Sequence, residues 1–124
     1  MSKTILIVDD SATMIVSLKA TLDMNGYVVE TAADGLLALG KLKNGSRPDL
    51  IITDVNMPHM DGIELIRNVR MLPAFRFTPI LTLTTESQAS KRDEAKRLGA
   101  TGWLVKPVSS VDLLKVIKQV VPGA

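Results

Sequence analysis

Short runs of apolar residues alternate along the chain with longer segments whose apolar residues recur every three or four positions. Runs of four or five apolar residues between turn signals are typical of buried strands, and the longer spacing is typical of amphipathic helices. The pattern predicts strands at 4–8, 27–31, 50–53, 80–84 and 102–105, each followed by a helix. Five such units in 124 residues predict an α/β fold, a doubly wound parallel sheet with helices on both faces.

Turn and capping residues agree with this division. Asn-Gly pairs are typical of helix ends, and an Asp or Ser followed three residues later by an acid is typical of a helix start. The chain has two signals of each kind, at Asn25-Gly26, Asn44-Gly45, Asp61 with Glu64, and Ser109 with Asp112. We expect the last helix to end near residue 120 or 121.

Composition narrows the class of protein. With 46% hydrophobic and 23% charged residues, the chain has the composition of an ordinary soluble domain, and its length suits one domain, 1–124, with no output domain. The net charge of +2 is spread among acids, so nucleic-acid binding is not indicated. There is no cysteine and no apolar run of about 18 residues, which argues against thiol chemistry and a membrane span. We expect a cytoplasmic protein.

Three acids stand where predicted strands end. Asp9 and Asp10 follow the apolar run 5–8, and Asp54 follows the run 50–53. Two unit charges about 4 Å apart repel by roughly 4 kcal/mol at an effective dielectric constant near 20. Both carboxylates of such a pair therefore stay ionised only if a cation lies close to them. An isolated Asp-Asp pair fits a polar strand end that caps the next helix equally well. The third acid favours a functional site.

Other polar residues follow the neighbouring predicted strands. Thr84 and Thr85 lie at the end of the fourth strand, and Lys106 comes directly after the fifth. In open parallel sheets, ligands bind beyond the carboxyl ends of the strands. We therefore expect the acids, the hydroxyls and the lysine to lie at one edge of the sheet.

Four segments together resemble one family. They are Ile7-Val8-Asp9-Asp10, residues 53–62 (Thr-Asp-Val-Asn-Met-Pro-His-Met-Asp-Gly), Leu83-Thr84-Thr85-Glu86 and residues 103–107 (Trp-Leu-Val-Lys-Pro). This combination resembles the receiver domain of bacterial two-component response regulators, especially the single-domain chemotaxis regulators. The resemblance covers nearly the whole chain and implies a flavodoxin-like (βα)5 fold with strand order 2-1-3-4-5.

The resemblance also implies a role for each acid. Asp54 matches the phosphoacceptor, whose carboxylate takes a phosphoryl group from a phosphohistidine. The implied ligands of a Mg²⁺ cofactor are Asp10, Asp54 and the backbone carbonyl of Asn56, with Asp9 acting through water. Magnesium suits such a site because it takes oxygen ligands and bridges to phosphate oxygens. Lys106 and Thr84 match the residues that bind the phosphoryl oxygens.

Thr84 and Trp103 match the switch pair of the family, in which the aromatic residue turns inward when the hydroxyl moves. The best-known chemotaxis regulators carry tyrosine at the position of Trp103, and the family usually has a small residue at the position of Thr85. These two departures bear on the amplitude of the switch and on access to the phosphoryl group. Pro107 matches a family proline that follows a cis peptide bond, here Lys106–Pro107.

The implied partners are proteins. The resemblance implies a sensor histidine kinase, of the chemotaxis type, and a downstream protein that binds the face of the fourth helix, fifth strand and fifth helix. We expect a monomer that is not an enzyme and catalyses only its own phosphorylation and dephosphorylation, with neither nucleic acid nor membrane as a partner. Within the family, a phosphate sink or a relay intermediate remains an alternative to a chemotaxis regulator.

Two other classes share parts of this pattern. A magnesium-dependent phosphatase of the haloacid dehalogenase type needs a second Asp two residues after its nucleophile, where this chain has Asn56. A flavodoxin-like FMN module needs a phosphate-binding loop where this chain has Asp9 and Asp10, and aromatic residues are only 3% of the sequence. His59, the only histidine, is expected to be a solvated loop residue.

Overall fold

The computed structural model describes residues 2–85 and 89–124, which form five strands and five α-helices. The strands are β1 (Thr4–Val8), β2 (Val28–Ala32), β3 (Leu50–Asp54), β4 (Ile80–Thr84) and β5 (Gly102–Val105). The helices are α1 (Ala12–Met24), α2 (Gly35–Lys43), α3 (Gly62–Met71), α4 (Ala89–Arg97) and α5 (Ser110–Val120), with a short 3₁₀ helix, η1 (Pro73–Phe75), after α3. None of these helices is both long and apolar enough to cross a bilayer.

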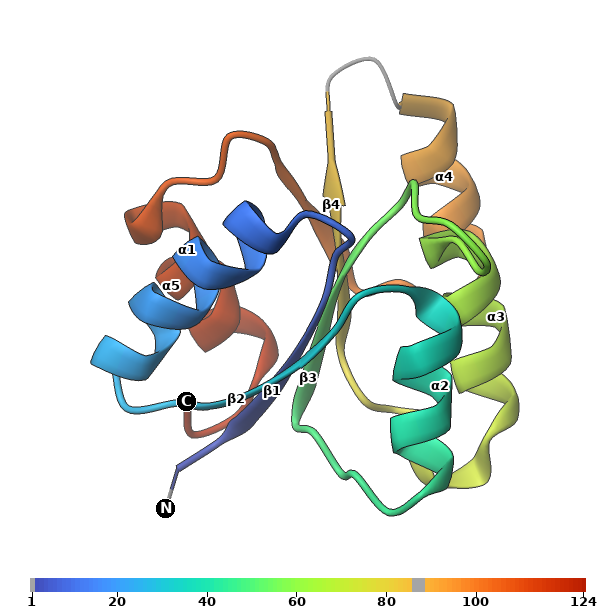
Figure 1. The fold of residues 1–124 in the computed structure, drawn as a ribbon, viewed down its shortest axis with the longest axis horizontal. Helices are drawn as coiled ribbons and strands as arrows, with labels where there is room; N and C mark the ends of the chain where they lie inside the picture. The colour runs from blue at the N-terminus through green and yellow to red at the C-terminus, as the bar shows by residue number, and fades with distance from the viewer. Residues whose placement is uncertain (1, 86–88) are drawn as a thin grey trace.

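The strands form one parallel sheet in the order β2-β1-β3-β4-β5. Helices α1 and α5 cover one face of the sheet, and α2, α3 and α4 cover the other (Figure 1). The predicted doubly wound α/β fold and the strand order implied by the resemblance are both confirmed. The order reverses between β1 and β3, so the loops that follow these two strands diverge at the sheet edge where ligands bind in such folds.

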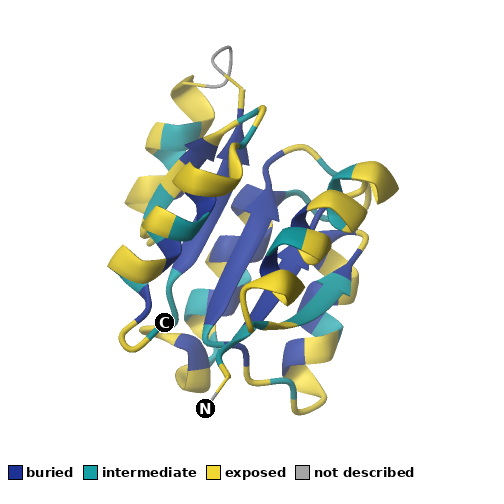
Figure 2. Cartoon of the chain, turned by 90° about the vertical axis from the view of Figure 1, so that its left-hand side faces the viewer, coloured by how far each residue is buried: buried dark blue, intermediate teal, exposed yellow. Residues whose placement is uncertain are grey.

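The central strands are buried on both faces, which explains their continuous apolar runs. Because successive side chains of a strand point to opposite faces, β1 contributes to two separate cores. Ile5 and Ile7 pack with residues of α1 and α5, whereas Leu6 and Val8 pack with residues of α2 and α3. Figure 2 shows the buried sheet between helices whose outer faces are exposed. Because both faces of the sheet are covered by apolar residues, polar functional groups can gather only at the two ends of the strands.

The helix boundaries follow the predicted signals. Asp61 and Ser109 are the N-caps of α3 and α5, and each side chain accepts a hydrogen bond from the main-chain N–H three residues later, at 2.8 and 3.1 Å. Asn25 and Asn44 cap the carboxyl ends of α1 and α2, and the glycine after each has a positive φ angle. Helix α5 ends at residue 120, as predicted.

Two strands differ from the prediction: β2 lies one residue later at both ends, and β3 is one residue longer. The N–H of Tyr27 donates to the carbonyl of Leu22 at 3.1 Å, so Tyr27 belongs to the turn that ends α1. The first bond of β2 to its neighbour joins the N–H of Val28 to the carbonyl of Lys3, at 2.9 Å. Strand β3 includes Asp54, because this residue is still in register with β4.

Gly62 brings the first residue of α3 against the end of β3. Its N–H donates to the carbonyl of Val55 at 2.8 Å. A Cβ atom added to Gly62 would overlap the main-chain oxygen of Asp54, so no larger residue fits without moving the backbone. The glycine therefore sets the distance between α3 and the strand end that carries Asp54.

We expect opposite effects from alanine at two glycines. Gly62→Ala should lower the free energy of unfolding by about 1–3 kcal/mol, because the added methyl group overlaps the Asp54 carbonyl. Gly40→Ala should raise it by about 0.5–1 kcal/mol, because Gly40 lies inside α2 and has no atom within 4 Å of an added Cβ. Urea unfolding at pH 7 without metal measures both changes. A Gly62→Ala protein as stable as the wild type would contradict the close contact.

Candidate functional site

Asp9 is a fully buried carboxylate at the end of β1. Its Oδ1 accepts a hydrogen bond from the N–H of Ser11 at 2.9 Å. Within the described residues its Oδ2 accepts no hydrogen bond, and the Nζ of Lys106 lies 3.6 Å from it. The next residue, Asp10, is exposed. The pair thus offers one carboxylate held inside the protein and one open to solvent.

Asp54 ends β3 and is also buried. Its Oδ1 accepts a hydrogen bond from the N–H of Val55 at 2.8 Å, and its Oδ2 lies 3.2 Å from the Nζ of Lys106. The hydroxyl of Thr53 donates to the main-chain carbonyl of Asp54 at 2.9 Å. One oxygen of this carboxylate is therefore fixed by the backbone, while the other faces a cation.

The three acids lie together, as predicted, and form a candidate metal site. One oxygen from each of Asp9, Asp10 and Asp54 can be chosen so that all three lie within 4.8 Å of one another. An all-oxygen donor set suits a hard divalent cation such as Mg²⁺. The Oδ2 of Asp9, buried and without a hydrogen bond among the described residues, fits this reading because a bound cation would satisfy it directly or through water. Asn56 is exposed in the loop two residues after Asp54, where its backbone can complete such a site.

Lys106 is held beside the acids by its own main chain. Its N–H donates to the carbonyl of Thr84 at 2.7 Å, which ties the residue after β5 to the end of β4. The peptide bond between Lys106 and Pro107 is cis. Thr84 is fully buried, and its hydroxyl reaches the carbonyl of Leu104 only at 3.5 Å, the long limit of a hydrogen bond. The threonine hydroxyl is thus weakly engaged.

Trp103 lies on the last strand of the sheet and contacts α4. Its side chain is on β5, and the residue remains 45% exposed. The guanidinium group of Arg92, on α4, lies 5.2 Å from the centre of the Trp103 ring, a cation–π distance. Thr85 is exposed, and Glu86 lies outside the described residues. The ring therefore contacts α4, on the face that the resemblance assigns to a partner.

Sequence reasoning missed one pair of residues near this site. The Nδ1 of His59 lies 2.8 Å from the Oδ2 of Asp34, which is buried at the start of α2. The expectation of a solvated His59 is incomplete, because its side chain is 68% exposed but has a buried partner. An Asp before an apolar helical segment does signal an N-cap. Nothing in the sequence pattern signals that Asp34 also reaches the loop after β3.

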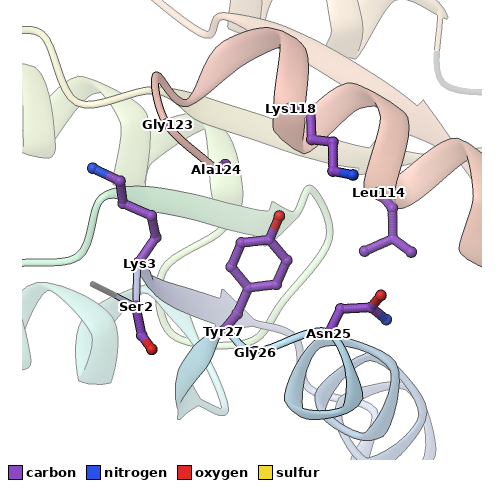
Figure 3. Close-up of a pocket in the computed structure, with 9 residues that line it drawn as sticks. All are labelled: Ser2, Lys3, Asn25, Gly26, Tyr27, Leu114, Lys118, Gly123 and Ala124. Atoms are coloured by element: carbon purple, nitrogen blue, oxygen red, sulfur yellow. The ribbon is translucent and has the colours of Figure 1, made fainter.

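A hollow lies at the opposite end of the sheet from the acids. It has a volume of about 480 Å³, and the ring of Tyr27 stands between Lys3 and Lys118 in it (Figure 3). Lys3 precedes β1 and Tyr27 precedes β2, so the hollow lies at the amino ends of the strands. It is therefore separate from the acids, which follow the carboxyl ends.

The fold and this site define a flavodoxin-like α/β domain with an acid–lysine cluster at the carboxyl edge of its sheet. The model of the response regulator receiver domain family matches residues 5–118. The chain belongs to this family.

Individual proteins support the assignment. The chain is 38% identical over 117 residues to the chemotaxis protein CheY-3 of Vibrio cholerae, covering 94% of this chain and 89% of that one. The solved structure of the chemotaxis response regulator CheY4 of the same species has a TM-score of 0.91 and 49% identity, covering 98% of this chain and 100% of that one. The receiver domain of a Pseudomonas aeruginosa sensor histidine kinase, solved with magnesium coordinated in its active-site cleft, has a TM-score of 0.88 and 28% identity over 97% and 98% of the two chains.

The pKa of Asp9 is raised above its ordinary value, mainly because burial disfavours the charged form. The hydrogen bond from the Ser11 N–H and the charge of Lys106 lower the pKa of Asp9. The negative charges of Asp54 and Asp10 raise it further. A raised pKa in the folded state means that ionised Asp9 costs stability at neutral pH. This cost is absent below the ordinary aspartate pKa of about 3.9, where the carboxyl is protonated in both folded and unfolded chains.

Asp9→Asn should therefore raise the free energy of unfolding of the metal-free protein at pH 7. The amide still accepts the Ser11 N–H and removes one buried charge. The gain should shrink as the pH falls toward 4, where the wild-type carboxyl becomes protonated. Urea unfolding in EDTA across this pH range measures the effect, and Asp10→Asn, at an exposed position, serves as a control with a smaller gain. A destabilised Asp9→Asn protein at pH 7 would contradict the stated cost.

Proposed function

We propose that this protein is a response regulator that accepts a phosphoryl group on Asp54 from a sensor histidine kinase and signals by binding another protein. The observation that carries the proposal is the placement of Asp54. Its buried carboxylate stands at a strand end, 3.2 Å from the Nζ of Lys106 and beside Asp9 and Asp10. The role is that of a phosphoacceptor, and the protein catalyses only its own modification and its reversal.

The proposed step is transfer from phosphohistidine to Asp54. A carboxylate oxygen of Asp54 attacks the phosphorus, the P–N bond breaks, and its electron pair returns to the imidazole nitrogen. The product is an acyl phosphate on Asp54. The N–H of Val55 holds Oδ1 at 2.8 Å, which leaves Oδ2, on the Lys106 side, as the oxygen better placed to attack. The Lys106 ammonium group offsets charge on the transferred group.

We propose Mg²⁺ as the cofactor of this step. The ligands would be Asp10, Asp54 and the backbone carbonyl of Asn56, with Asp9 acting through water. The all-oxygen acid cluster and the magnesium in the cleft of the Pseudomonas receiver domain support this choice. When bound, the cation supplies positive charge that offsets the repulsion between the acids and the phosphoryl oxygens.

Thr84 and Trp103 are proposed to report the modification. The weakly held hydroxyl of Thr84 loses little when it turns to a phosphoryl oxygen. Trp103, now held against Arg92, would follow into the space that Thr84 leaves, and phosphorylation would bias this equilibrium. The face of α4, β5 and α5 then differs between the two states, so a partner can distinguish them. The names of the two Vibrio relatives support a role in chemotaxis.

Trp103, the only tryptophan, allows a direct test of the phosphoacceptor. We expect Mg²⁺ with beryllofluoride or a small phosphodonor to change Trp103 fluorescence, because the switch moves the ring relative to Arg92. In the wild type, mass spectrometry should also show the incorporation of one phosphoryl group from the phosphodonor. Asp54→Asn should abolish this incorporation and the fluorescence change that depends on the donor. Asp61→Asn, which keeps a capping side chain in the same loop, should retain both. Unchanged fluorescence together with no incorporation at Asp54 would refute the proposal.

Arg92 should set the balance of the Trp103 switch. An exposed cation–π contact contributes about 0.5–1 kcal/mol, so Arg92→Gln should lower the beryllofluoride concentration at half-response by about two- to fivefold. Arg92→Lys keeps the cation and should give a smaller shift. Fluorescence titration at fixed Mg²⁺ concentration measures the midpoints. A midpoint in Arg92→Gln equal to that of the wild type would show that the contact does not hold the resting state.

A further inference from the structure

The turn at residues 32–35, from the end of β2 to the start of α2, contacts the loop after β1, which carries Asp9 and Asp10, and the loop after β3, which carries Asn56. One hydrogen bond joins it to the loop after β1, and two join it to the loop after β3. They run from the N–H of Asp9 to the carbonyl of Ala32 (3.1 Å), from the N–H of Gly35 to the carbonyl of Met60 (3.1 Å), and between Asp34 Oδ2 and His59 Nδ1 (2.8 Å). The turn therefore spans the two sides of the acid cluster without contributing a ligand to it.

Asp34 uses its two carboxylate oxygens for different purposes. Oδ1 accepts the N–H of Leu37 at 2.8 Å and so caps α2, while Oδ2 holds His59. The residue is buried, with 5% of its surface exposed. The pKa of Asp34 is lowered, first by the hydrogen bond to His59 and then by that to the Leu37 N–H. The carboxylate is thus the anchor of the pair, fixed to the helix by one oxygen.

His59 needs such an anchor, because its backbone is in the left-handed region at φ 66°. This conformation costs a residue with a Cβ roughly 1 kcal/mol or more and persists only where surrounding contacts hold it. The bond to Asp34 is the side-chain contact that can do so. Beside it, a Cβ on Gly35 would lie 2.6 Å from the oxygen of Met60, so the main chains of the turn and the loop are in direct contact.

We propose that Asp34 and His59 are positioning residues for the metal site. Through them the turn fixes the loop 55–60, which carries Asn56, relative to Asp9. Neither side chain touches the cation or the phosphoryl group, and both act on the backbone that presents the ligands. The metal part of this proposal rests on the proposed function. The proposal is that the affinity of the site for Mg²⁺ depends on the hydrogen bond between Asp34 and His59, neither of which is a metal ligand.

Two variants break the pair while keeping the local backbone. Asp34→Ser retains an oxygen that can cap α2 but loses the one that reaches His59. His59→Gly removes the side chain and adopts a positive φ without strain. We expect each to weaken Mg²⁺ binding about tenfold, as loss of a group that orients metal ligands typically does. The double variant should be no weaker than either single variant, because both remove one interaction.

Rescue and matched controls separate positioning from general destabilisation. His59→Asn also tolerates a positive φ and offers an N–H donor, so it should bind Mg²⁺ more tightly than His59→Gly. Thr101→Val removes the hydrogen bond from the Ile80 N–H at the amino end of the sheet, so it should lower stability and leave the Mg²⁺ affinity unchanged. Calorimetric titration of the wild type and of each variant with MgCl₂ gives the dissociation constants.

Amide hydrogen exchange of the metal-free proteins gives a readout that does not depend on the cation. The Gly35 N–H, bonded to Met60, should exchange several-fold faster in Asp34→Ser and His59→Gly than in the wild type. Wild-type Gly35 exchange in both variants would overturn the proposal, and so would wild-type Mg²⁺ affinity in both. If the wild type binds no Mg²⁺ at millimolar concentrations, the proposed metal site itself fails, and faster Gly35 exchange would still establish that the pair holds the loop.

Discussion

Mutual repulsion among Asp9, Asp10 and Asp54 is the constraint to which the rest of the site responds. Their oxygens can approach within 4.8 Å of one another, two of the residues are buried, and burial weakens the screening that water provides. Lys106 offsets part of the charge, with its Nζ 3.2 Å from Asp54 and 3.6 Å from Asp9. One ammonium group against three carboxylates leaves a negative excess, which a further cation would offset. The cluster therefore costs stability, most directly through the buried charge of Asp9.

Main-chain hydrogen bonds help to hold this unfavourable arrangement in place. Three main-chain hydrogen bonds among the described residues tie segments together at the carboxyl edge, from Asp9 to Ala32, from Gly62 to Val55 and from Lys106 to Thr84. Such bonds do not depend on the state of the carboxylates, so the loops keep their spacing when charge at the site changes. The two apolar cores, one on each face of the sheet, supply the stability that offsets the cost of the acid cluster.

Different parts of the molecule could be predicted from sequence for different physical reasons. Strand β1 was predicted at its observed bounds because a strand buried on both faces is apolar throughout, whereas β2 was misplaced by one residue because Tyr27 bonds to α1. The meeting of Asp9, Asp54 and Lys106 followed from the parallel sheet alone, while their chemical roles came from the family resemblance. The pair of Asp34 and His59 could not be predicted, because it joins two loops through a left-handed backbone that leaves no periodic trace.

The position of Lys106 also has a consequence for biosynthesis. Asp9 follows the first strand and Lys106 the last, so their ion pair joins residues separated by most of the chain. A chain leaving the ribosome presents its acids long before the lysine is made, and contacts between such distant residues are late events in folding. The cluster acquires its internal counter-charge only when β5 has been added to β4. A product truncated before residue 106 has the acids without the lysine, and in a partly folded chain the two are not yet paired, so the complete cluster is present only in the finished domain.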